Sequence, residues 1–147
     1  PMLMFVEFCE TDYYGHHGKW KEYLNAAHKN DRFIRELWAY CQSDEFYRGN
    51  TTFIITCDHG RGESLGNHIN RGEVDSLASW HEHGRKIVGS NQTWLVAFGK
   101  NIQHLGEVEG GRTIYTKQVA PTVASLLHIP FTSERSDMGR PIYKILK

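Results

Sequence analysis

Short runs of apolar residues alternate along the chain with longer stretches in which apolar residues recur at a helical spacing. Three of the runs, residues 2–8 (MLMFVEF), 51–57 (TTFIITC) and 93–98 (TWLVAF), are almost continuously apolar, and the second is rich in β-branched residues. Runs of this length and composition are typical of strands that are buried on both faces of a parallel sheet. The pattern therefore predicts three strands.

Two stretches have apolar residues at a period of 3.6 and predict helices. From residue 19 to about residue 42, a stripe of apolar side chains lies opposite a face of Lys, Arg and Glu. Asp31 falls on the apolar stripe, and we expect one continuous helix there rather than a break with a new N-cap. A second helix is expected over residues 116–127, and it should end before Pro130.

The expected elements follow the order strand, helix, strand, long loop, strand, helix. This alternation is typical of an α/β fold with a mainly parallel sheet flanked by helices, and the 147 residues suffice for one domain over residues 1–147. The loop over residues 60–91 is polar, rich in glycine and too long for an ordinary connection. We therefore expect this loop to carry function.

Charge and composition argue against several classes of protein. Lys plus Arg and Asp plus Glu number 17 each, without a basic stripe interleaved with aromatic residues, so we expect no nucleic-acid footprint. No apolar run reaches about 18 residues, so we expect no membrane segment. The chain enters an apolar run directly after Pro1, which we interpret as the C-terminal part of a longer protein. A periplasmic or secreted location is compatible with that interpretation, and the oligomeric state stays open.

The first candidate site follows the first expected strand. Asp12 and His16 are four residues apart, so one helical turn or a tight loop can direct both side chains at one ion. A carboxylate oxygen and a neutral imidazole nitrogen are common Zn²⁺ ligands. Taken alone, this pair is weak evidence, because a strand-end cap beside an exposed histidine is the commoner reason for such a spacing.

The second candidate site follows the second expected strand, where Asp58 and His59 are adjacent. Both side chains can face one ion only if the backbone bends, and Gly60 and Gly62 allow such a bend. The alternative is an Asx-turn with a surface histidine. In a parallel sheet both strand ends lie at the same edge, so the two pairs together would supply most of two adjacent metal sites.

Residues 52–60 (TFIITCDHG) resemble the strand and Asp-His-Gly signature of the alkaline phosphatase superfamily. Residues 119–127 and 138–142 resemble the closing helix and tail of the same family, so the resemblance covers nearly the whole chain. It implies the C-terminal part of an alkaline-phosphatase-like fold. It also implies that Asp12 and His16 serve one metal site, and that Asp58 and His59 serve the other.

A later histidine completes the first metal site in this family. His83, followed by Gly84 and then by the third expected strand, resembles the arrangement in members of the phosphodiesterase type. We therefore favour His83 over His81 as the ligand. His81 would lie on the same side of an extended segment and is a candidate for orienting a ligand or contacting substrate.

Three cations are further candidates for contact with an anionic substrate. Arg61 follows the Asp-His-Gly turn, and Arg85 and Lys86 follow His83. Each could bind a phosphate or sulfate oxygen or orient a metal ligand, although a solvated cation of the loop is the commoner role for such residues.

The resemblance implies a metal-dependent hydrolase of small-molecule phosphate or sulfate esters, of the phosphodiesterase, phosphatase or sulfatase type. Two divalent ions are expected; the mixed Asp and His ligands favour Zn²⁺, and Mn²⁺ would accept the same set. The family's nucleophile is not found in this chain, so the chain alone is expected to be inactive. The alternatives are a phosphomutase or phosphotransferase of the same superfamily, and a non-catalytic, metal-stabilised degenerate domain.

Overall fold

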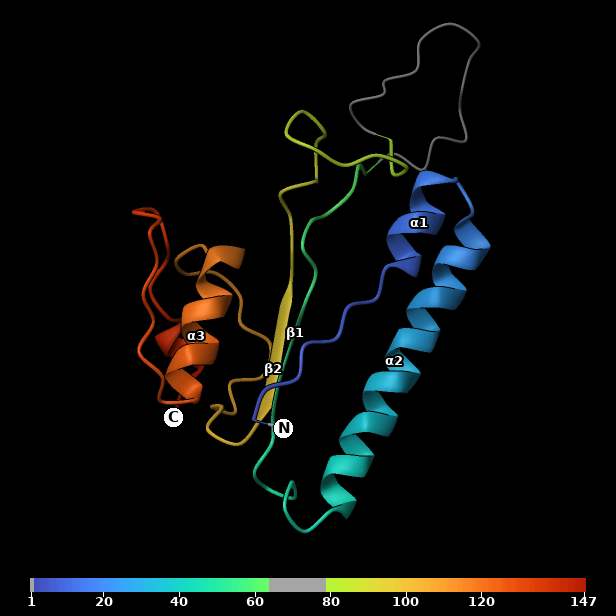
Figure 1. Cartoon of the computed structure of the whole chain (residues 1–147). Helices are drawn as coiled ribbons and strands as arrows, with labels where there is room; N and C mark the ends of the chain where they lie inside the picture. The colour runs from blue at the N-terminus through green and yellow to red at the C-terminus, as the bar shows by residue number, and fades with distance from the viewer. Residues whose placement is uncertain (1, 64–78) are drawn as a thin grey trace, which may run out of the picture. The chain divides into compact units, whose positions relative to one another are not determined.

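The computed structural model describes residues 2–63 and 79–147 (Figure 1). In chain order the elements are α1 (Glu10–His16), α2 (Trp20–Ser43), β1 (Thr52–Thr56), β2 (Leu95–Gly99), a 3-10 helix (Thr116–Gln118), α3 (Val119–Leu126) and a second 3-10 helix (Tyr143–Ile145). Two compact units are formed, one mainly by residues 3–48 and 56–94 and the other mainly by residues 49–55 and 95–147. Residues 64–78 of the predicted functional loop lie outside the described residues.

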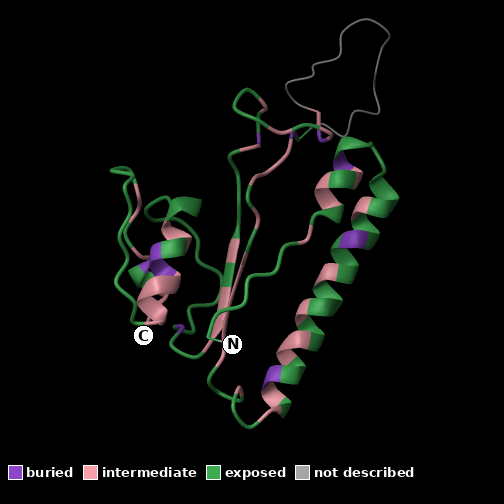
Figure 2. Cartoon of the chain, viewed as in Figure 1, coloured by how far each residue is buried: buried purple, intermediate pink, exposed green. Residues whose placement is uncertain are grey.

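Helix α2 spans 24 residues without a break, which confirms the predicted single helix through Asp31. Of the expected apolar stripe, Cys41 is buried, whereas Trp20 and Leu24 are 46% and 39% exposed. Ala26 is also buried, and Figure 2 shows how few buried positions α2 has. The helix ends at Ser43 because Asp44 accepts hydrogen bonds from two backbone N–H groups beyond it, while Arg48 donates to two of the last helical carbonyls. None of the described helices is long and apolar enough to cross a membrane.

The start of α2 also anchors a distant loop. Trp80 is only 6% exposed and packs edge-on against Trp20 and Tyr23, with ring centroids 5.1 and 5.7 Å apart. Aromatic pairs at such distances are favourable beyond the area they bury. The segment that carries His81 and His83 is therefore held beside the first turn of α2.

Strands β1 and β2 form a two-stranded sheet at nearly the predicted positions. Lys100 N donates to Thr51 O at one end, and Thr56 Oγ1 donates to Trp94 O at the other. The start of β1 thus lies beside the end of β2, so the two strands are antiparallel. The expectation of a parallel pair is wrong for these strands. A parallel pair needs a crossover connection, usually helical, and the described part of the connection contains no helix.

Residues 2–8 do not form the predicted first strand. Met2 is 75% exposed and Phe5 is 86% exposed, and the segment has no ladder partner among the described residues. An apolar run expresses a preference for burial, whereas a strand also requires a neighbouring backbone that pairs with its N–H and C=O groups. The prediction used the first property and had no information on the second.

Helix α3, preceded by its 3-10 turn, confirms the helix predicted over residues 116–127. Its Thr122 is fully buried and uses its hydroxyl twice, donating to Gln118 O at 2.6 Å and accepting from Ile142 N at 2.9 Å. The second bond joins the C-terminal tail to the helix. This contact, with the buried Ile142 side chain, forms the centre of the small second unit.

Candidate metal centre

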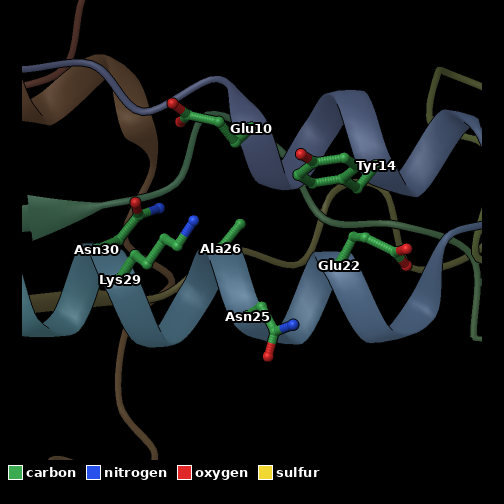
Figure 3. Close-up of a pocket in the computed structure, with 7 residues that line it drawn as sticks. All are labelled: Glu10, Tyr14, Glu22, Asn25, Ala26, Lys29 and Asn30. Carbon is green, nitrogen blue, oxygen red and sulfur yellow. The ribbon is translucent and has the colours of Figure 1, made fainter.

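One face of helix α1 packs against α2, and the opposite face carries Asp12 and His16. Successive helical residues are about 100° apart, so Glu10 and Tyr14 lie opposite Asp12 and His16. Glu10 and Tyr14 line a shallow groove against α2, together with residues such as Lys29 (Figure 3). The packing of α1 on α2 by that face leaves Asp12 and His16 directed at the loops. Their Oδ1 and Nε2 atoms are 3.5 Å apart across one helical turn, the first of the two arrangements expected from the sequence.

The segment after β1 bends as the glycines predicted. His59 N donates to Asp58 Oδ1 at 3.0 Å, and Gly60 N donates to Ser90 O at 2.9 Å. A side chain at Gly60 would collide with the carbonyl oxygens of Gly89 and Gln92, so only glycine fits. The bend directs the His59 ring towards Asp12, with Nε2 3.7 Å from Oδ1.

His59 also has one ring nitrogen engaged by the backbone. Its Nδ1 lies 2.9 Å from Gly60 O, which can only accept a hydrogen bond. Nδ1 must therefore carry the proton when the ring is neutral, and Nε2 keeps its lone pair. This arrangement is typical of histidines that bind metal through Nε2.

The loop after Trp80 brings in His83. Its Nε2 is 3.0 Å from His16 Nε2 and 3.6 Å from Asp12 Oδ1, and its ring stacks on His59 with centroids 3.7 Å apart. His81 instead packs its ring edge-on against Trp80 and lies beside Gly18. The geometry supports the predicted preference for His83.

Asp12, His59 and His83 offer three ligand atoms that all lie within 4.8 Å of one another, and His16 adjoins the same group. We call these four residues the ligand cluster. Metal bonds of about 2.0–2.1 Å in tetrahedral geometry place ligand atoms about 3.3 Å apart. The separations of 3.5–3.7 Å from Asp12 Oδ1 to the three imidazoles are near that value. Asp12, His59 and His83 therefore fit one ion of this size, and His16 lies beside them. Their side chains are 24–43% exposed, so one side of the cluster is open to solvent.

Asp58 stands at the edge of this arrangement. Its side chain is 87% exposed, and its Oδ2 is 3.6 Å from His59 Nε2. The predicted division assigned Asp12, His16 and His83 to one ion, and Asp58 and His59 to another. The structure instead groups His59 with Asp12 and His83, while the Asp58 carboxylate, at the bend after β1, stays exposed.

The environment lowers the pKa of His83 below its ordinary value of 6.5. Burial is the largest cause, followed by the neighbouring His59; Asp12 acts in the opposite direction, and His16 and Arg61 lower the pKa further. A lowered pKa leaves the imidazole neutral near pH 7. A neutral imidazole has the lone pair that a metal ion requires.

The three candidate cations have different surroundings. Arg85 and Lys86 are exposed, and neither has a side-chain bond or ion pair to another described residue. Arg61 is only 12% exposed and pairs with Asp12, so it is neither a solvated loop cation nor free to meet a substrate. The sequence left open whether Arg61 contacts substrate or orients a ligand, and it did not reveal the burial of Arg61 against Gly15, near the end of α1.

One carboxylate and three imidazoles, presented by a short helix and two loops, define an α/β chain with a candidate metal centre. Residues 2–94 match the model of the Metalloenzyme superfamily, and the chain belongs to this superfamily. Its members are α/β metal-dependent enzymes with an alkaline-phosphatase-like fold, so the resemblance seen in the sequence is confirmed.

A curated relative is the 2,3-bisphosphoglycerate-independent phosphoglycerate mutase of Gracilaria tenuistipitata var. liui. The two are 30% identical over 63 residues, which are 43% of this chain and 11% of that protein. The chain therefore spans a small part of the length of this relative. No solved structure matches the chain.

Proposed function

We propose that this chain supplies metal ligands to an enzyme that transfers phosphoryl groups with the aid of divalent ions. The observation that carries the proposal is the ligand cluster, in which Asp12, His59 and His83 converge on one solvent-open point with His16 beside them. Membership of the Metalloenzyme superfamily supports metal dependence. Bound ions would polarise a phosphoryl oxygen and stabilise the charge that develops on the transferring group.

Asp12, His59 and His83 would hold one ion, with His16 beside them. Asp58, which lies outside this group, would contribute to a second ion. Zn²⁺ suits the mixture of carboxylate and imidazole, and Mn²⁺ is the other candidate. The attacking group would come from another part of the enzyme.

Transfer between two positions of a phosphorylated small molecule is the better-supported reaction. The phosphoglycerate mutase relative supports a phosphomutase or phosphotransferase over the hydrolase that the sequence first suggested. Hydrolysis of phosphate or sulfate esters by the same metal chemistry is the second candidate, because the two reactions differ only in whether a hydroxyl group or water receives the transferred group. A metal-stabilised domain without catalysis is the third.

The test uses the full-length protein that contains this chain, loaded with Zn²⁺ or Mn²⁺. Phosphoglycerate isomerisation is followed by NMR, and release of phosphate or sulfate is followed with an aryl phosphate, a bis-aryl phosphate and an aryl sulfate. Isomerisation that His59→Ala abolishes would support the mutase, and release of phosphate or sulfate that the same variant abolishes would support the hydrolase. Metal binding without either activity would contradict both and leave the non-catalytic domain.

A further inference from the structure

We infer that Arg61 is a positioning residue that joins the helix carrying Asp12 and His16 to the loop carrying His83, and so assembles the metal ligands. The inference rests on the proposed function, because it gives Arg61 its task at the same site. It differs from the substrate contact suggested by the sequence, since the guanidinium is directed into the protein and only 12% of the side chain is exposed.

The guanidinium has four acceptors from two separate segments. On one side Nη2 donates to the Asp12 backbone carbonyl at 2.9 Å and to the Asp12 carboxylate. On the other side Nη1 donates to the carbonyls of His81 and Trp80, at 2.9 and 3.4 Å. The planar fork of arginine suits this bridging, whereas an ammonium is a point charge and lacks the fork.

Helix α1 is shaped to receive this side chain. Gly15 is buried between Asp12 and His16 in the chain, and a Cβ there would lie 2.5 Å from the central carbon of the guanidinium. Glycine inside a helix is less favourable than alanine by about 0.5–1 kcal/mol, so its presence needs a compensating reason. The close approach of Arg61 is that reason, and it is independent of the hydrogen bonds.

Arg61 acts on the ligands by restricting them. Without Arg61, the Asp12 carboxylate would lose a fixed partner, and the loop after Trp80 would be held by the packing of Trp80 without the bonds to its carbonyls. A carboxylate has about four lone-pair positions, so Asp12 can accept a hydrogen bond from Arg61 and bind an ion at the same time. Ordering these groups before the ion arrives removes part of the entropic cost of binding it.

A competing role predicts the opposite result. As a cation beside Asp12, Arg61 could repel a divalent ion, so that its removal would tighten metal binding. Three of its four acceptors are backbone carbonyls, which hold the guanidinium whether or not the carboxylate is engaged. The contacts therefore favour positioning over competition.

Titration of the full chain with Zn²⁺, and with Co²⁺ monitored by its visible absorption, tests the inference. Arg61→Gln should weaken binding by about 10–100-fold, the usual effect of losing a group that orients metal ligands, and should change the Co²⁺ ligand-field bands. Arg61→Lys keeps the charge without the fork and should restore only part of the affinity. The matched control is Arg135→Gln, which breaks an exposed pair with Asp137.

Gly15→Ala is a second variant that keeps Arg61 and displaces it. It should lower metal affinity to a similar degree, and its effect should vanish when it is combined with Arg61→Gln. The single variant Gly15→Ala keeps the inference testable if Arg61→Gln fails to fold. Unchanged or tighter Zn²⁺ binding by folded Arg61→Gln, or additive effects of the two substitutions, would overturn the inference. If Arg61→Gln lowers the affinity for Zn²⁺ but the wild-type full-length protein is inactive, only the proposed function is refuted.

Discussion

His59 differs from the other ligand candidates because a backbone carbonyl fixes which of its ring nitrogens carries the proton. Gly60 O holds the proton on Nδ1, and the bend that follows directs Nε2 towards Asp12. His16 and His83 face each other through Nε2 atoms only 3.0 Å apart. Two lone pairs at that distance repel unless a proton or a cation lies between them, which makes the pair a natural place for a positive ion.

Replacement of His59 by alanine should therefore remove metal binding without unfolding the chain. The imidazole is partly exposed, so we expect little loss of stability, whereas the loss of affinity for Zn²⁺ should exceed the roughly 10–100-fold effect of losing an orienting group. Competition with a chromophoric chelator measures the affinity. His17→Ala is the control, because His17 adjoins His16 but bonds its ring to Tyr13 O. Equal affinities for the two variants would contradict the assignment of His59.

The lowered pKa of His83 makes a prediction for pH. A histidine with a lower pKa in the folded state than in the unfolded state binds fewer protons when folded, so stability rises with pH across that interval. Without metal, the free energy of unfolding should decrease as the pH falls below about 6.5, the ordinary histidine value. Urea denaturation at a series of pH values measures this slope.

The variant His83→Gln supplies the comparison for that slope. It lacks the titrating group, so its stability should fall less steeply over the same interval. An NMR titration of the His83 ring with a midpoint at or above 6.5 would refute the prediction directly.

At the scale of elements, the sequence predicted the helices correctly but not the pairing of the strands. Helices α2 and α3 were predictable because a 3.6-residue period is contained within each helix. The one-turn spacing of Asp12 and His16 is local in the same sense. Strand pairing depends on which distant backbone is available, and an apolar run does not contain that information. This explains why β1 pairs with β2 in the antiparallel direction, and why residues 2–8 pair with no other described segment.

The same distinction explains which parts of the site could be predicted. Asp12 and His59 were recognised by residue type and spacing and His83 by the family resemblance, and the structure brings these three residues together. The burial of Arg61 depends on groups 19 to 49 residues away in the chain. The inward turn of His59 likewise depends on contacts of Gly60 with residues 89–92. No periodic pattern encodes such contacts.

The link between α3 and the C-terminal tail can be tested at Thr122. Thr122→Val keeps the shape but leaves the buried N–H of Ile142 without an acceptor, so the free energy of unfolding should drop by about 1–3 kcal/mol. Thr122→Ser keeps the hydroxyl and should lose less than this. Urea denaturation compares the variants, with Thr132→Val, at an exposed position, as the control. Equal stability of Thr122→Val and wild type would show that the bond is not important.

At the scale of the whole molecule, the division into two units separates the metal ligands from the rest. All four residues of the ligand cluster belong to the unit of residues 3–48 and 56–94, and α3 belongs to the other. The superfamily match, over residues 2–94, covers the unit with the ligands in full. Metal binding is therefore expected to act on one unit first.

Hydrogen exchange with and without Zn²⁺ tests this expectation. An ion present at 100 times its dissociation constant stabilises the state that binds it by about 2.7 kcal/mol. Amide exchange in α1 and in residues 79–84 should slow accordingly, because opening either one removes ligands. Exchange in α3 should be unchanged, since no ligand lies on it. Removal of the ion with a chelator should reverse the effect.

The His59→Ala variant is the control for nonspecific binding, since Zn²⁺ should leave its exchange unaltered. Protection that spread equally to α3 would mean that the two units open together, and the division would then have no thermodynamic consequence. Protection confined to α1 and residues 79–84 would show that the ion joins segments far apart in the chain. Arg61 joins the same two segments without metal, so Arg61→Gln should weaken their protection even in the chelated protein, and by more than it weakens that of α3.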